Sequence, residues 1–77
     1  MRERIKEVIK STFELEDVPD SISQNNCTAW DSMHHLMLVV ALETEFGISF
    51  EPEDIVSMNS FDEIEKKIKH IMGVKNV

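Results

Sequence analysis

The sequence predicts an all-α fold, a bundle of three longer helices and one short third helix, with a long loop between the first two helices. Apolar residues recur at intervals of three and four positions in several segments, which is the spacing of one helix face. The chain has two glycines and two prolines, so β-turn chemistry is scarce. An apolar content of 42% argues against disorder, and 77 residues suffice for one small core. We therefore expect a single domain over residues 1–77.

The charge balance limits the partners of the chain. Fifteen acidic and eight basic residues give a net charge of −7. This charge disfavours nucleic acid and anionic membranes, and it favours a basic patch on another protein. No segment has the length and hydropathy of a membrane span or a signal peptide. Cys27 is the single cysteine and cannot form an internal disulfide, which fits a reducing compartment. We expect a cytoplasmic monomer.

The first helix is expected from Arg2 to Leu15. The long connection from Glu16 to Trp30 follows, and Pro19 within it prevents the helix from continuing. A loop of this length in a small domain is usually functional or disordered. The apolar stripe of the first helix consists of Ile5, Val8, Ile9, Thr12 and Phe13.

The second helix is expected from Met33 to Phe46. Asp31 is a good N-cap, because its carboxylate can accept hydrogen bonds from free amides of the first turn. Gly47 suits the left-handed conformation that ends a helix. Ser32 lies where the loop becomes the helix. From the residues alone, it is a second capping residue, a polar first-turn residue or a point of covalent attachment.

Catalysis by Ser32 is not expected. The Gly-x-Ser-x-Gly elbow of hydrolases is absent, because Trp30 and His34 stand at the glycine positions. His35 lies within helical reach of Ser32, but no third group orients it, and so short a chain offers little room for a substrate cleft. We expect no metal site, since the adjacent His34 and His35 point to different sides of the helix and no Cys/His ligand spacing exists. The sequence therefore predicts a protein that is not an enzyme.

The second helix is apolar on nearly every side. One arc is expected to face the core and consists of His35, Leu38, Val39, Leu42 and Phe46. The other arc consists of Met33, Leu36, Met37, Val40 and Ala41, with Thr44 among them. A chain of this size cannot bury both arcs, so we expect the second arc to be a contact surface unless the long loop covers it.

Two further helices are expected in the last third of the chain. Pro52 suits the first position of a short helix with an acidic first turn. Ser60 and Glu63 have the spacing of a capping box at the start of the last helix, and Gly73 ends that helix. Its apolar stripe consists of Phe61, Ile64, Ile68, Ile71 and Met72.

The segment around Ser32 resembles the attachment motif of acyl carrier proteins. Asp31-Ser32-Met33 stands where the family has Asp-Ser-Leu, and the run from Ala41 to Ile48 follows at the family's spacing. Met33 replaces the commoner leucine with a side chain of similar volume. The resemblance covers nearly the whole chain in length and helix order, and it implies the four-helix fold of these carriers.

The resemblance also implies the function of a carrier. Ser32, flanked by Asp31 and Met33, would hold 4′-phosphopantetheine from coenzyme A through a phosphodiester. The arm would carry an acyl or aminoacyl group as a thioester. The implied partners are a phosphopantetheinyl transferase, a loading ligase or acyltransferase, and an acyl-consuming enzyme.

Three residues near Ser32 are candidate contacts of the arm or its cargo: Trp30, His35 and Leu36. For two of them an alternative exists, because Trp30 can pin the loop against the bundle and His35 can be a hydrogen-bonded core residue.

The surface expected to bind partners consists of Met33, Met37, Val40, Ala41, Glu43 and Thr44. His34, Met37 and Thr44 stand where carriers of fatty-acid synthesis commonly have acids. This departure favours a dedicated pathway, such as aminoacyl, polyketide or surface-glycan modification, over housekeeping fatty-acid synthesis. The alternative function is a small helical interaction module without phosphopantetheine.

Overall fold

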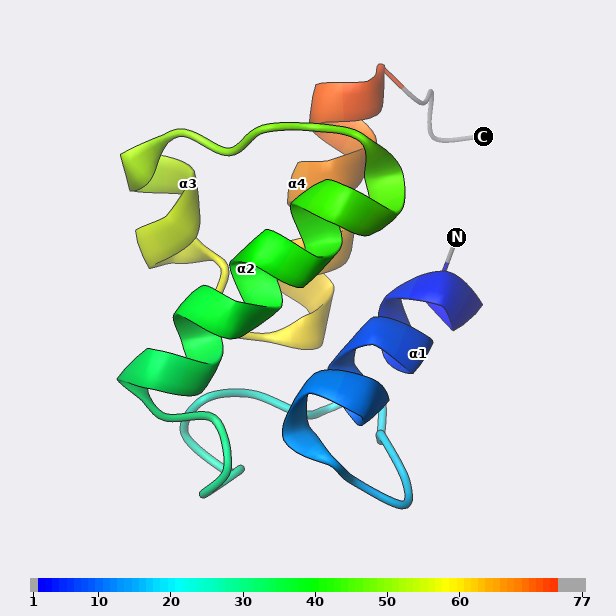
Figure 1. The fold of residues 1–77 in the computed structure, drawn as a ribbon, viewed down its shortest axis with the longest axis vertical. Coiled ribbons are helices and arrows are strands. Elements are labelled where there is room, and N and C mark those ends of the chain that lie inside the picture. Colours follow the sequence, from blue (N-terminus) through cyan, green and yellow to red (C-terminus); the bar gives the residue numbers. More distant parts are fainter. Residues whose placement is uncertain (1, 74–77) are drawn as a thin grey trace.

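The structure, a computed structural model, describes residues 2–73 and has the expected all-α architecture (Figure 1). Its four helices are α1 (Arg2–Phe13), α2 (Ser32–Phe46), α3 (Pro52–Ser57) and α4 (Phe61–Met72). The described residues contain no strand, only an isolated bridge between Ser23 and Ser60. None of the described helices is both long enough and apolar enough to cross a bilayer.

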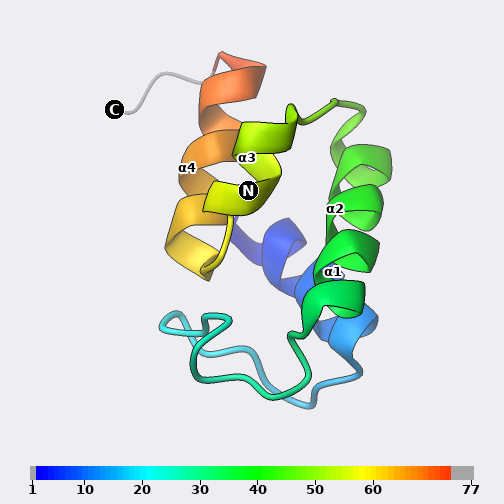
Figure 2. The same ribbon diagram turned by 90° about the vertical axis from the view of Figure 1, so that its left-hand side faces the viewer.

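The helices surround one hydrophobic core. In Figures 1 and 2, α1 and α3 lie on opposite sides of α2 and α4, and the long loop after α1 closes one end of the bundle. Each of α1, α2 and α4 contributes a stripe at the predicted spacing. The most deeply buried side chains are Ile5, Ile9, Trp30, Leu38, Leu42, Met58, Phe61, Ile64 and Ile68.

The prediction that the first helix reaches Leu15 is wrong by two residues. The helix ends at Phe13 because Glu14 turns into the left-handed region, with a φ of 55°. The backbone N–H of Leu15 then donates to the carbonyl of Lys10 at 3.0 Å. This bond satisfies a free carbonyl of the last turn. Glycine is the usual residue at such a position, so the sequence contained no stop signal at Glu14.

The ends of the other helices follow the predicted caps more closely. α2 ends at Gly47, which is left-handed with a φ of 64°. α3 begins at Pro52, and the side chain of Asp54 accepts from the backbone N–H of Glu51 at 3.0 Å. That hydrogen bond and the ion pair with Lys67 hold the pKa of Asp54 below its ordinary value of 3.8.

Within the described residues, the capping box expected at the start of α4 forms one of its two bonds. The Ser60 hydroxyl accepts from the Glu63 N–H at 3.2 Å. The Glu63 carboxylate instead lies 3.6 Å from Lys66 Nζ, so it faces along the helix rather than back to its start.

The long loop is tethered to α1 and α4. Arg2 lies 2.6 Å from Glu65 of α4 and 3.2 Å from Asp20 of the loop, and its guanidinium stacks 4.7 Å above the Phe61 ring. The hydrogen bond and charge of Lys6 hold the pKa of Asp20 below its ordinary 3.8, and Arg2 contributes a smaller lowering. These ion pairs hold the loop at Asp20, and the backbone N–H of Phe61 donates to the carbonyl of Ile22 at 3.0 Å, which joins the loop to the start of α4.

Candidate functional site

Ser32 is the first residue of α2 and is exposed to solvent. The preceding Asp31 has an extended backbone, and its Oδ1 accepts from the backbone N–H of His34 at 2.8 Å. The predicted N-cap is thus confirmed, and it fixes the first turn of the helix on which Ser32 lies. The backbone amides at this end give the site a local positive potential.

The Asp31 carboxylate also interacts with the side chain of His34. The imidazole Nδ1 of His34 lies 2.9 Å from the same Oδ1. The backbone hydrogen bond from His34, followed by the bond to its side chain, holds the pKa of Asp31 below its ordinary 3.8. Asp31 is therefore ionised at neutral pH and orders the loop-to-helix junction.

Ser32 has none of the partners of a catalytic serine. Within residues 2–73, no side chain forms a hydrogen bond with its hydroxyl. Both ring nitrogens of His35 are occupied elsewhere, by Trp30 and by the carbonyl of Ile55. The hydroxyl is exposed, and within the described residues no side chain is placed to activate it as a nucleophile.

Trp30 pins the end of the long loop to the bundle. It is 2% exposed, and its ring packs 5.3 Å from that of Phe13 at an angle of 49°. Its indole Nε1–H donates to Nδ1 of His35 at 2.9 Å. With so little free surface, the ring serves the loop-anchoring role in this structure. Contact between Trp30 and a prosthetic arm stays a prediction, because the ring would first have to be uncovered.

His35 lies half-buried on the side of α2 that faces the bundle, as its place in the core arc predicts. Besides accepting from Trp30, it has its Nε2 2.7 Å from the carbonyl oxygen of Ile55 in α3. The Trp30 and His35 rings are stacked at 26°, with 6.2 Å between centroids. His35 is therefore a hydrogen-bonded packing residue, and any contact with cargo is an additional prediction.

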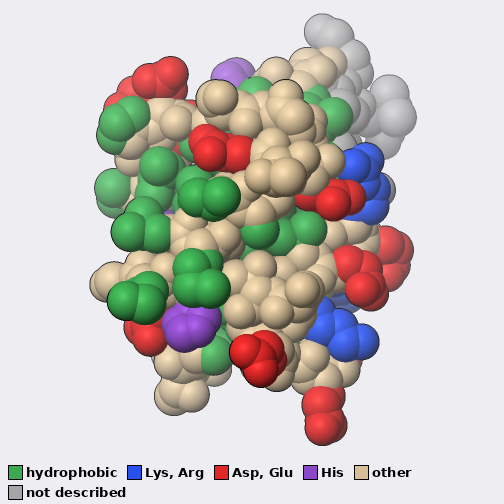
Figure 3. Space-filling view, in the orientation of Figure 1, with side chains coloured by type: hydrophobic (Ala, Val, Ile, Leu, Met, Phe, Trp, Pro, Cys, Tyr) green, Lys and Arg blue, Asp and Glu red, His purple; other side chains and the backbone are tan. Residues whose placement is uncertain are grey.

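An exposed apolar surface extends along α2 next to the site. Met33 is 70% exposed, Leu36 57%, Met37 48% and Val40 60%. In α3, Val56 is 79% exposed. Figure 3 shows hydrophobic side chains gathered over α2 and α3, with charged side chains over α1 on the other side of the view. We call these five residues the apolar face. The long loop does not cover it.

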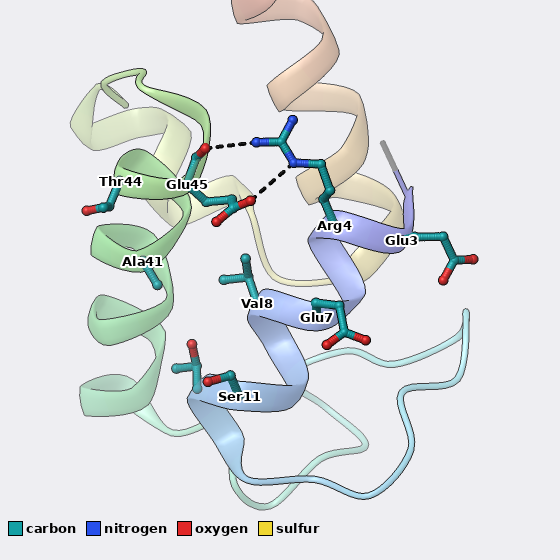
Figure 4. Close-up of a pocket in the computed structure, with 9 residues that line it drawn as sticks. Glu3, Arg4, Glu7, Val8, Ser11, Ala41, Thr44 and Glu45 are labelled. Atoms are coloured by element: carbon teal, nitrogen blue, oxygen red, sulfur yellow. Dashed lines mark hydrogen bonds and ion pairs between the residues drawn. The ribbon is translucent and has the colours of Figure 1, made fainter.

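Three residues predicted for the same surface lie elsewhere. Glu43 is half-buried, and its Oε2 accepts from the backbone N–H of Phe50 at 2.9 Å, which fastens the segment after α2. The Thr44 hydroxyl donates to the carbonyl of Val40 at 3.0 Å. Ala41 and Thr44 line a groove between α1 and α2 (Figure 4). The predicted partner-binding set is thus divided between the apolar face, this groove and a structural contact.

The groove between α1 and α2 has a volume of about 580 Å³ and was not predicted from the sequence. Arg4 closes one end, donating to the Glu45 side chain at 3.1 Å and to its carbonyl at 3.0 Å (Figure 4). Val8 and Thr12, which were predicted for the apolar stripe of the first helix, are only half-buried and line this groove. Arg4 and Ser11 lie at helical spacing from Val8, and this spacing is the signal that places them on the same wall. The residues that line the groove are Glu3, Arg4, Glu7, Val8, Ser11, Thr12, Ala41, Thr44 and Glu45.

The described residues contain no group of three or more His, Cys, Asp or Glu side chains placed to hold a metal ion. Near Ser32 they place an exposed hydroxyl at a capped helix start, with an apolar face beside it.

The chain is similar in sequence to two known proteins. It is 33% identical over 76 residues to an acyl carrier protein homolog of Mycoplasma genitalium. It is 30% identical over 76 residues to an acyl carrier protein homolog of Mycoplasma pneumoniae. Each match covers 96% of this chain and 90% of the relative. No protein-family model matches the chain. The extent of the two matches, the four-helix fold and the serine at the start of α2 agree: the chain belongs to the acyl carrier protein family.

Proposed function

We propose that the protein carries acyl or aminoacyl groups as thioesters on 4′-phosphopantetheine attached to Ser32. The observation that supports this most is the exposed serine that opens α2 directly after its N-cap, in a chain of the acyl carrier protein family. The hydroxyl is free of intramolecular hydrogen bonds in the described residues, so an enzyme can reach it.

The residues around Ser32 fit a phosphodiester. The start of α2 carries free backbone amides and the positive end of the helix dipole, which favour an anion by about 0.3–1 kcal/mol. Asp31 maintains this start through its bond to the His34 N–H. The arm, when bound, supplies the thiol on which the cargo is held. The chain's own residues orient the attachment point and present it to partners.

The proposed docking surface is the apolar face. The acids of the C-terminal half of α2 have partners within the chain: Glu45 pairs with Arg4, and one oxygen of Glu43 accepts from the Phe50 N–H. Large apolar side chains therefore dominate what α2 presents beside Ser32. Methionine adapts to differently shaped partners, which suits a carrier that meets several enzymes in turn. Those enzymes are the phosphopantetheinyl transferase, the loading enzyme and the enzyme that consumes the cargo.

The proposal is tested by mass spectrometry after incubation with coenzyme A and a broad-specificity phosphopantetheinyl transferase. The protein should gain one phosphopantetheine, and Ser32→Ala should gain none. Ser49→Ala is a matched control, since Ser49 is also exposed but lies in the segment after α2, and it should be modified normally. Modification of Ser32→Ala, or no modification of the unaltered protein, would show that Ser32 is not the attachment site.

A second function, a helical interaction module without phosphopantetheine, is favoured by the apolar face alone. Such a module would need Met33, Met37 and Val40 exposed, as they are, and would not need Ser32. The same experiment separates the two functions. The module predicts an unmodified protein whose partner binding survives Ser32→Ala.

A further inference from the structure

His35 connects three separate segments through its two ring nitrogens. The indole of Trp30 can only donate, so Nδ1 of His35 must accept through its lone pair at 2.9 Å. In the neutral ring the hydrogen is then on Nε2, which donates to the Ile55 carbonyl at 2.7 Å. One side chain of α2 thus holds both the segment that precedes Ser32 and the short helix α3.

α3 has few other attachments to the bundle. It has six residues, none of them fully buried, and its partly buried Ile55 packs against the core. Asp54 pairs with Lys67 of α4 at 2.9 Å, and Met58 directly after α3 is completely buried. Within residues 2–73, the bond from His35 to the Ile55 carbonyl is the one hydrogen bond that joins α2 to α3. A helix this short is unstable unless tertiary contacts hold it, so each attachment has a large effect on its order.

The position of α3 matters because Val56 belongs to the apolar face. Val56 is 79% exposed on α3, whereas the other members of the face lie on α2. A partner that contacts both helices needs them in a fixed relation to each other and to Ser32. Trp30, two residues before Ser32, is bonded to the same imidazole in addition to packing against Phe13.

We propose that His35 is a positioning residue for docking of the phosphopantetheinyl transferase, the enzyme that must reach Ser32 at the start of α2. It holds α3 against the start of α2, so that Val56 and the apolar side chains of α2 form one surface beside Ser32. The effect of His35 on docking rests on the proposed function, whereas its effect on the position of α3 does not. The effect on α3, which is the structural half of the proposal, can therefore be tested without an attached arm.

Two substitutions separate the two hydrogen bonds. His35→Asn keeps an acceptor at the position of Nδ1 but has no donor that reaches Ile55. His35→Gln keeps a donor at the distance of Nε2 but has no acceptor at the position of Nδ1. His70→Gln is the control, because His70 is exposed on α4. Trp30 is the single tryptophan, so its indole proton gives one signal in the NMR spectrum.

The first measurement is amide hydrogen exchange by NMR. In His35→Asn the amides of α3 should exchange about 5-fold faster, as expected for the loss of one hydrogen bond, while those of α1 and α4 stay unchanged. In His35→Gln the α3 amides should keep their protection, and the Trp30 indole proton should instead lose its hydrogen-bonded shift. Equal α3 exchange in His35→Asn and the unaltered protein, or loss of α3 protection in both variants, would overturn the proposal.

The second measurement is the kinetics of phosphopantetheine transfer from coenzyme A. If α3 loses its position relative to α2, KM for His35→Asn should rise about 5-fold with little change in kcat. KM for His35→Gln should be close to that of the unaltered protein. An unchanged KM in a variant whose α3 exchanges faster would refute the docking half. If the unaltered protein accepts no phosphopantetheine, the proposed function fails and so does the docking half. The exchange data then still decide whether His35 holds α3.

Discussion

Replacing Met37 by glutamate tests whether the apolar face is a docking surface. Met37 is 48% exposed, so its burial contributes only about half of the 1.5–3 kcal/mol of a fully buried side chain. Glutamate keeps two methylenes and has a similar helix propensity. We therefore expect Met37→Glu to lower the free energy of unfolding by about 0.5–1 kcal/mol. Loss of an interface anchor should weaken docking by about 1–2 kcal/mol, or about 5- to 30-fold in kcat/KM for transfer.

The neighbouring residue provides the opposite case. Leu38 is 0% exposed, so Leu38→Glu removes a buried leucine, which costs about 2–5 kcal/mol, and adds an unpaired carboxylate to the core. A domain of this size has about 3–5 kcal/mol of stability in total. Leu38→Glu should therefore be unfolded, although it lies one position from Met37.

The assays are urea denaturation followed by far-UV circular dichroism and transfer kinetics with coenzyme A. Met72→Glu is the matched control, since Met72 is 42% exposed but lies at the end of α4. Met72→Glu should be at least as destabilised as Met37→Glu, because its added acid lies at the C-terminal end of a helix, and its transfer kinetics should match those of the unaltered protein. An unfolded Met37→Glu would show that the face is part of the core. A folded Met37→Glu with unaltered transfer would show that partners do not dock there.

Three further predictions concern stability. Asp31→Ala should lower the midpoint of urea denaturation through loss of the N-cap. Folding lowers the pKa of Asp31, so the contribution is present above its ordinary 3.8 and is lost as the pH falls from there through the lowered folded-state pKa, which urea melts at several pH values will show. Arg2→Met should cost about 1 kcal/mol, because Oε1 of the buried Glu65 loses its 2.6 Å partner while Lys69 stays 3.4 Å from Oε2. Lys66→Met on the exposed side of α4 should cost under about 0.5 kcal/mol, and equal losses would contradict this account. Gly47→Ala should cost about 1–2 kcal/mol in thermal or urea melts through its φ of 64° alone, since no atom lies within 4 Å of an added Cβ, and a neutral effect would argue against the left-handed end of α2.

The helices and most of their ends were predictable because their signals are local. Asp31, Pro52 and Ser60 are cap or first-turn residues that act within one turn, and Gly47 supplies the left-handed conformation by itself. The apolar periodicity predicted the core stripes, because residues three or four positions apart lie on the same face of a helix. The end of α1 was missed because Glu14 adopts a conformation that its own sequence does not favour.

The environment of Ser32 required the tertiary structure. Sequence identified the serine, its cap and an apolar arc, but it left the roles of Trp30 and His35 open. Trp30 bonds His35, and His35 bonds the carbonyl of Ile55, twenty residues further along the chain. No local sequence pattern shows that these segments lie close together in space. In the same way, a wheel projection placed Ala41 on one face with Met37. In the folded chain α1 lies beside Ala41, so this residue lines the groove between the two helices.

The sequence by itself therefore determined the fold class, the second helix to within one residue of its start, predicted at Met33 and found at Ser32, and the candidate attachment point. Which polar groups are free was decided only by the tertiary structure. Glu43 read as a surface acid, yet its carboxylate is taken by the Phe50 N–H, and Glu45 is taken by Arg4. The physical reason is that a hydrogen bond depends on a partner brought close by the whole bundle, whereas caps and helix faces depend on residues three or four positions away.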